Sequence, residues 1–88
     1  MIINIKDLKN KIIYRANYRG TKEMDKLLGS FVKIYINQIT DDELPLLSDL
    51  LDHDDENLYK LNQRLKMTIK IETNRITELF KHYRYKSE

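Results

Sequence analysis

The chain has no cysteine and no tryptophan, and it has one proline and two glycines among 88 residues. Without cysteine it can form neither a disulfide framework nor a thiolate zinc site. No apolar run approaches the ~18 residues that span a bilayer, so we expect no membrane insertion. A chain of this length has room for one small core. We therefore predict a single domain, residues 1–88, stabilised by the packing of its own side chains.

Side chains suited to catalysis are also scarce. His53 and His82 share no metal-site spacing, and no serine lies in the setting of a nucleophile elbow. Neither Gly20 nor Gly29 belongs to a glycine loop that could cradle a phosphate. The sequence therefore predicts no catalytic residue, no metal site and no stably bound cofactor, and we do not expect an enzyme.

Charge is strongly segregated along the chain. Residues 1–37 hold eight Lys or Arg and three acids, residues 38–56 hold eight acids and no Lys or Arg, and residues 57–88 again hold eight basic residues and three acids. A module that binds duplex nucleic acid is expected to present one dominant basic face, and this pattern argues against one. The two basic segments keep a small helical nucleic-acid-binding or regulatory module as the alternative function.

Apolar residues recur at helical spacing in the first part of the chain. Their stripe predicts a helix from Ile5 to Tyr18, and Gly20 is typical of the left-handed position that ends a helix. Thr21 is suited to cap a second helix, whose apolar face runs from Met24 to Tyr35. We expect Gly29 to permit a close approach by another helix.

A third helix is predicted from a capping box. Thr40 lies three residues before Glu43, which is the spacing at which cap and glutamate satisfy each other's backbone amides. Pro45 removes one early hydrogen bond, so we expect a distorted first turn. The helix should end near Asp52.

The final third of the chain is less regular. Asp54 or Asp55 can cap a fourth helix, and Leu65 extends its apolar stripe, so we expect this helix to run past Asn62. Residues 68–72 alternate like a strand, but a lone strand would have no partner, and we assign them to the last helix.

The end of the chain is polar. We expect residues 83–88 to fray as a tail. Together the patterns predict an all-α fold, a small bundle of about five helices.

The segment from Arg19 to Asp25 combines a helix stop, a helix cap and charged side chains in one corner. Arg19 suits the negative end of the first helix and Glu23 suits the positive end of the second, so an ordinary helix connection would explain both. Tyr14 and Tyr18 lie beside the corner, either in rim packing or in contact with a partner, because tyrosine is enriched at interfaces. For three other tyrosines we favour rim packing: Tyr35, Tyr59 and Tyr83.

The run 11–31 resembles the signature of the SdhE family, whose mitochondrial members are called succinate dehydrogenase assembly factor 2. The family's Arg-Gly-x-x-Glu hallmark is present as Arg19, Gly20 and Glu23. A Met-Asp pair and a Leu-Gly-x-Phe segment follow it, as in the family. Residues 40–51 and 54–59 resemble the family's acidic third helix and its Asp-x-x-Leu-Tyr/Phe segment. Three positions depart from the pattern, two where many members carry further arginines and one where tryptophan is frequent: Asn17, Tyr18 and Leu61.

This resemblance implies a small helical protein that binds the flavoprotein subunit of succinate dehydrogenase, and in some bacteria that of fumarate reductase. It implies that the protein promotes covalent attachment of FAD to that subunit. The partner-binding surface would contain Arg19, Gly20 and Glu23, with Arg15 and Asp25 beside them. We expect a monomer that acts in the cytoplasm without a nucleic-acid partner. The start of the chain resembles neither a secretory signal nor a transit peptide, which favours a bacterial protein.

Overall fold

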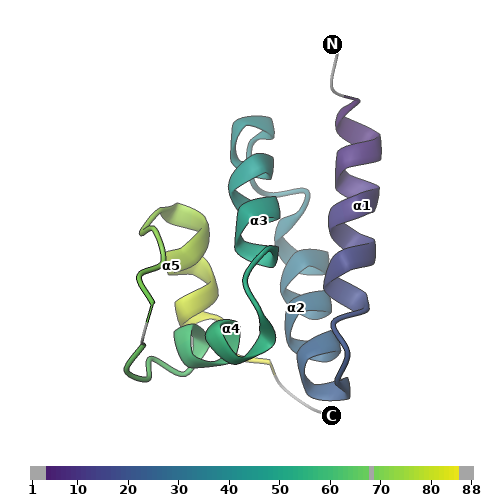
Figure 1. Cartoon of the computed structure of the whole chain (residues 1–88). Coiled ribbons are helices and arrows are strands. Elements are labelled where there is room, and N and C mark those ends of the chain that lie inside the picture. Colours follow the sequence, from purple (N-terminus) through teal and green to yellow (C-terminus); the bar gives the residue numbers. More distant parts are fainter. Residues whose placement is uncertain (1–3, 68, 86–88) are drawn as a thin grey trace.

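The computed structural model describes residues 4–67 and 69–85, which contain five α-helices and one 3₁₀ turn and no strand (Figure 1). The elements in chain order are α1 (Ile5–Asn17), α2 (Lys22–Tyr35), η1 (Asp41–Glu43), α3 (Leu44–Leu51), α4 (Asp55–Asn62) and α5 (Arg75–His82). The predicted all-α bundle of about five helices is confirmed.

Helix α3 occupies the middle of the bundle. Helix α1 packs against α2 and α3, while α5 packs against α3 and α4. In Figure 1 α4 runs across the lower end of the bundle, and α5 lies on the side of α3 away from α1. All four leucines of α3 that follow the helical repeat are buried: Leu44, Leu47, Leu50 and Leu51. Since α3 meets helices on both sides, its burial joins the first and last parts of the chain.

The core is centred on the ring of Phe31 in α2. Its centroid lies 5.2 Å from that of Phe80 in α5 and 5.4 Å from that of Tyr83, both in edge-on arrangements. Tyr35 adds a tilted ring at 5.0 Å. Edge-on aromatic pairs add about 0.5 to 1.5 kcal/mol to the free energy of burial. The last helix is thus fixed to α2 through aromatic contacts.

The predicted helix caps are confirmed. Thr21 Oγ1 accepts a hydrogen bond from the amide of Met24 at 3.2 Å, at the start of α2. Asp54, rather than Asp55, caps α4, because its Oδ1 accepts from the amide of Asn57 at 2.9 Å. Each bond satisfies one of the amides that a helix start leaves without an intrahelical partner.

The predicted third helix is divided into a 3₁₀ turn and an α-helix. The backbone amide of Thr40 donates to Glu43 Oε1 at 2.9 Å, as the capping-box spacing predicts. Pro45 is the second residue of α3 and has no N–H to donate, so the residues before it form the tighter turn η1. The predicted distortion of the first turn is confirmed.

Two predictions about the following segment are wrong. Helix α4 ends at Asn62, because Arg64 adopts a left-handed backbone with φ of 57°, and Leu65 is 51% exposed rather than buried. Residues 69–72 are not helical, and Thr68 lies outside the described residues. The last helix starts later because Asn74 and Thr77 cap each other, the side chain of each accepting from the other's amide at 3.0 and 2.8 Å.

The predicted frayed tail begins with residues 83–85, and the prediction is wrong for Tyr83, which bonds to the bundle. The side chain of Asn62 is 1% exposed, and its Nδ2 donates to the carbonyl of Tyr83 at 2.9 Å as well as to a carbonyl in α5. The hydroxyl of Tyr83 is 2.6 Å from Ser30 Oγ in α2. These bonds hold the segment after α5 against the bundle. The rest of the predicted tail, residues 86–88, lies outside the described residues.

Candidate docking surface

The connection between α1 and α2 is a tight corner held by the first turn of α2. The carboxylate of Asp25 accepts hydrogen bonds from the amide of Arg19 and, at 3.3 Å, from that of Gly20. Gly20 has φ of 121°, a region that residues with a Cβ rarely adopt, so glycine is required by the backbone. A Cβ at this position would have no heavy atom within 4 Å, which leaves the outer side of the corner open.

The side chain of Arg19 points into the molecule. Its Nε donates to Asp55 Oδ1 at 2.9 Å, and its two terminal nitrogens donate to the carbonyls of Leu51 and His53 at 2.7 and 2.6 Å. Only 11% of the side chain is exposed. Leu51 is the last residue of α3 and His53 lies just beyond it, where a helix leaves its carbonyls without intrahelical partners. Arg19 therefore fastens the α1–α2 corner to the connection between α3 and α4.

Arg15 makes a second tie one helical turn earlier. Its guanidinium donates to Ser48 Oγ at 3.0 Å and to Asp52 Oδ1 at 2.5 Å. The arginine side chain is 35% exposed and that of Asp52 is 65% exposed, so solvent weakens this ion pair. Arg15 and Arg19 together align α1 with α3.

Glu23 differs from the two arginines. It is exposed in the first turn of α2, and its carboxylate has no hydrogen bond or ion pair to any residue within the described part of the chain. A carboxylate here interacts favourably with the helix start and remains able to accept bonds from another molecule. The predicted site residues therefore divide into an exposed pair, Gly20 and Glu23, and a holding set, Arg15, Arg19 and Asp25.

Two tyrosines extend the exposed surface. Tyr14 and Tyr18 are 64% and 70% exposed, and their ring centroids are 4.6 Å apart. This geometry leaves both rings available for contact, in line with the partner reading of these residues. Rim packing is confirmed for Tyr35 and Tyr83, which pack against the core, and is wrong for Tyr59, which is 51% exposed.

The acidic middle of the chain faces basic residues from both ends. Asp52 pairs with Arg15 of α1, Asp55 pairs with Arg19 of the α1–α2 corner, and Glu43 pairs with Arg75 at 2.6 Å. The hydrogen bond from the Thr40 amide, followed by the bond from Arg75, lowers the pKa of the Glu43 carboxyl from its ordinary value of 4.5. Part of each basic segment is thus neutralised within the molecule, which reduces the charge available to a polyanion.

The described residues also lack two features that other functions would need. No group of three His, Cys, Asp or Glu side chains there is arranged to hold a metal ion. None of the helices in that part of the chain has the length and apolar character needed to cross a membrane.

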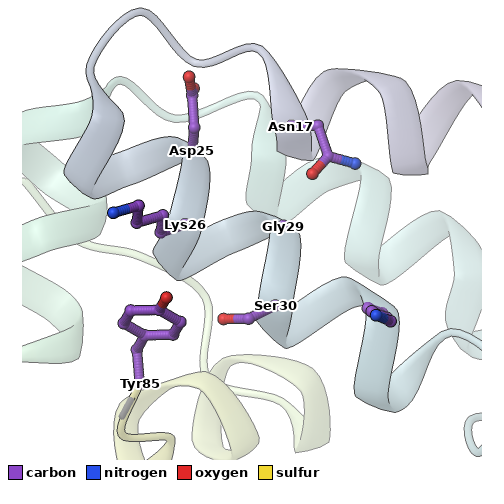
Figure 2. Close-up of a pocket in the computed structure, with 7 residues that line it drawn as sticks. Asn17, Asp25, Lys26, Gly29, Ser30 and Tyr85 are labelled. Atoms are coloured by element: carbon purple, nitrogen blue, oxygen red, sulfur yellow. The ribbon is translucent and has the colours of Figure 1, made fainter. Parts of the chain in front are cut away.

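Beside the corner, α2 carries a shallow hollow of about 320 Å³ (Figure 2). Asp25 lines it at the end nearest the corner, and Asn17 reaches over it from the end of α1. Tyr85, from the segment after α5, approaches it from the opposite side. No pattern considered in the sequence predicted this hollow, although its signal is present as a small residue, Gly29, between two lysines, Lys26 and Lys33.

The family model described as flavinator of succinate dehydrogenase matches residues 10–84. The chain belongs to this family. The matched range includes the whole corner, both arginine ties and the segment anchored by Asn62. The family's hallmark residues therefore lie at the junction of α1, α2 and the α3–α4 connection.

Curated relatives in the family come from eukaryotes and bacteria. The chain is 41% identical over 49 residues to the mitochondrial succinate dehydrogenase assembly factor 2 of Scheffersomyces stipitis, covering 56% of this chain and 33% of that protein. It is 34% identical over 55 residues to the FAD assembly factor SdhE of Acetobacter pasteurianus, covering 62% and 50%. It is 33% identical over 51 residues to the FAD assembly factor SdhE of Legionella pneumophila, covering 58% of this chain and 63% of that protein.

The chain spans less than two thirds of the length of each of these relatives. No solved structure matches it. Since the relatives include mitochondrial and bacterial proteins, a bacterial origin stays a prediction.

Proposed function

We propose that this chain is an assembly factor that binds the flavoprotein subunit of succinate dehydrogenase and promotes covalent attachment of FAD to it. The observation that carries this proposal is the match of residues 10–84 to the flavinator family. The flavoprotein subunit of fumarate reductase is proposed as a second partner of the same surface. The chain acts as a monomer in the cytoplasm and binds no FAD stably by itself.

The five predicted partner-binding residues act in two ways in this proposal. Gly20 and Glu23 meet the partner, because both are exposed at the corner and Gly20 offers backbone without a side chain. Arg15, Arg19 and Asp25 keep the corner in the shape that the partner meets, since their bonds run within the chain. A surface held in this way loses little conformational entropy on binding, which favours affinity.

The contribution to flavinylation is conformational. Binding at the corner stabilises one conformation of the flavoprotein subunit. In that conformation the flavin and the residue of the subunit that bonds to it are correctly oriented for reaction. The bond-forming groups belong to the partner and its FAD. A docking surface favours one conformation of its partner when it makes better contacts with that conformation than with others. The holding set supports this role because it keeps the surface of this chain in one shape.

Glu23→Ala tests the proposed contact. The side chain makes no bond within the described residues, so the substitution should lower the free energy of unfolding by only about 0.3 to 1 kcal/mol, through the lost helix-start interaction. Purified flavoprotein subunit is incubated with FAD and each variant, and covalent flavin is measured by in-gel fluorescence. We expect the flavin signal to fall while helicity by circular dichroism is retained.

Glu72→Ala is the matched control, because Glu72 is exposed and lies in the link before α5. It should support flavinylation at the wild-type level. If Glu23→Ala also does so, Glu23 does not contact the partner. A signal that is independent of this chain altogether would refute the proposed function.

Gly20→Arg and Gly20→Ala separate backbone strain from blocked contact. Both variants place a Cβ on a backbone with φ of 121°, so both should be destabilised by about 1 to 3 kcal/mol. Only the arginine projects a long side chain over the corner, so it should lose binding further at a temperature where both variants are folded. Equal flavinylation by the two variants would show that Gly20 acts only through the backbone.

The alternative of a nucleic-acid-binding module is tested with the same preparations. Binding of that class would weaken steeply with salt, because it depends on the release of counterions from phosphates. Under the proposed function, duplex DNA does not compete with the flavoprotein subunit at physiological salt.

A further inference from the structure

A continuous groove follows the seam between α1 and α2. The hollow beside the corner adjoins a second one of about 270 Å³, with which it shares Gly29 and Lys33. The second adjoins a third of about 350 Å³, with which it shares Ile13 and Ile36. The three hollows thus form one groove, called the seam groove below, that starts beside Asp25 and continues along α1 toward Ile5.

The close approach of the two helices at Gly29 creates this groove. A Cβ on Gly29 would overlap the side-chain oxygen of Asn17, so the end of α1 rests directly on the backbone of α2. The amide group of Asn17 is held in turn by the carbonyl of Ile13 at 2.8 Å. The predicted close approach at Gly29 is confirmed, and it leaves the flanking side chains to form the floor and walls of the groove.

The seam groove combines an aliphatic floor with cationic walls. Ile13, which is 38% exposed, and the buried Ile36 lie in the floor, and Ile5 lies at the far end. The walls carry four lysines, none of which forms an ion pair with a residue in the described ranges: Lys6, Lys9, Lys26 and Lys33. Among the described residues, Asp25 is the single acid in the lining, and its carboxylate is bonded to the corner amides. The groove therefore has an uncompensated positive charge.

We propose that the seam groove binds an extended, acidic segment of a partner protein that carries aliphatic side chains. The 13 residues of α1 span about 20 Å at ~1.5 Å per residue, which matches about six residues of extended chain at ~3.3 Å each. Alternate side chains of such a segment place aliphatic groups on the floor while its carboxylates face the lysines. Glu23 is not in the lining of the groove, and the proposal does not depend on which protein meets the corner.

A nucleic-acid strand fits the groove less well. Single-stranded nucleic acids bind through aromatic platforms on which successive bases stack. The floor of the groove is aliphatic, and the one aromatic side chain in its described lining, Tyr85, lies at one end. The groove therefore favours a peptide, and a nucleic acid becomes an outcome that the experiment distinguishes.

The test uses a fluorescein-labelled hexapeptide of alternating glutamate and leucine, titrated with the full chain and followed by fluorescence anisotropy. A peptide with lysine in place of glutamate and a labelled hexauridylate serve as comparison probes. We expect saturable binding of the acidic peptide only, with amide NMR shifts concentrated at Ile13, Gly29, Lys33 and Ile36. Absence of saturation, equal binding of the lysine peptide, or preferential binding of the hexauridylate would overturn the proposal.

Matched substitutions locate the binding. Ile13→Glu and Lys33→Glu should each raise the dissociation constant about tenfold, since each adds negative charge to the groove. Ile34→Glu is the control for Ile13→Glu, and Lys11→Glu is the control for Lys33→Glu, because both introduce the same side chain at exposed positions outside the groove lining. Each control should change the dissociation constant by less than about twofold. Equal losses for Ile13→Glu and Ile34→Glu, or for Lys33→Glu and Lys11→Glu, would overturn the groove assignment. Circular dichroism checks the fold. If Ile13→Glu unfolds, Lys33→Glu still tests the groove, because Lys33 is an exposed residue.

Discussion

The corner between α1 and α2 and the segment around α5 are both held by hydrogen bonds to side chains, but these bonds differ in how far apart in sequence their partners lie. In the corner, Asp25 bonds to amides five and six residues away, and Thr21 caps its own helix. At the other end, Asn62 bonds to a carbonyl 21 residues away and Tyr83 to a hydroxyl 53 residues away. The corner takes its shape mostly from local sequence, whereas the last segment takes its shape from the rest of the bundle.

Arg19→Ala should lower the free energy of unfolding most, because it removes the bonds that join the α1–α2 corner to residues distant in sequence. It deletes three hydrogen bonds and leaves Asp55 and two carbonyls without their donor, which should cost about 3 kcal/mol of unfolding free energy. Chemical denaturation measures this loss. Arg15→Ala, at the more exposed tie, should cost only about 1 kcal/mol. Equal costs would contradict the assignment of Arg19 as the main fastening.

Asn62→Ala should have the second largest effect. It should lower the free energy of unfolding by about 2 kcal/mol, because two carbonyls lose their donor. Hydrogen exchange should show faster amide exchange in α5 and unchanged protection in α1 and α2. Gln63→Ala is the neighbouring control and should leave α5 protected, since the side-chain Nε2 of Gln63 donates to the Asn62 side chain and, among the described residues, to no group in α5. Uniform deprotection of every helix would show that the two ends are not separable.

Asn74→Ala tests the local contribution at the C-terminal end. It removes the cap of α5 and should cost about 1 kcal/mol, measured by thermal unfolding. Asn74→Asp keeps an acceptor at the cap and should retain most of the stability. If the aspartate variant is as unstable as the alanine variant, the start of α5 is set by packing and not by its cap.

Glu43→Gln should have the smallest effect and a distinctive pH dependence. Because the folded state lowers the pKa of Glu43, its carboxylate contributes stability above the ordinary value of 4.5, and that contribution is lost as pH falls through the lowered pKa. The variant should therefore lose less stability than the wild type on going from about pH 6 to about pH 3. Acid titration of the denaturation midpoint checks this, and parallel pH profiles would contradict it.

Local signals predicted most of the first half of the fold. Threonine, aspartate and glutamate at cap spacing marked the starts of helices, Gly20 marked the corner, and Pro45 marked the distorted turn. These features depend on residues within one turn of each other, so a sequence pattern contains them.

The second half was predicted less well because its determinants are distant or easily overlooked. The alternating pattern in the link before α5 resembles a strand, but a lone strand would have no partner, and the segment was assigned to the last helix. The signal that this helix starts later is the reciprocal cap of Asn74 and Thr77. Nothing near Tyr83 in sequence indicates that the buried Asn62 and Ser30 bind it.

The resemblance predicted which residues form the candidate site, but it did not predict which of their side chains point outward and which bond within the chain. The resemblance placed Arg19 among the partner-binding residues, but its guanidinium is committed to Asp55 and two carbonyls of the same chain. That arrangement requires the α3–α4 connection to lie beside the corner, which is a property of the packed bundle. The sequence could not distinguish the holding residues from the exposed ones.

The inward orientation of Arg19 has a consequence for genetics. Under the proposed function, we expect substitutions at Arg19 and Glu23 both to reduce flavinylation in cells, but with phenotypes of different kinds. Loss of the Arg19 bonds enlarges the unfolded fraction that proteases remove, so its phenotype should be temperature-sensitive and accompanied by low protein abundance. Loss of the exposed Glu23 carboxylate should leave abundance normal at every permissive temperature, and increased expression should rescue the first mutant far better than the second.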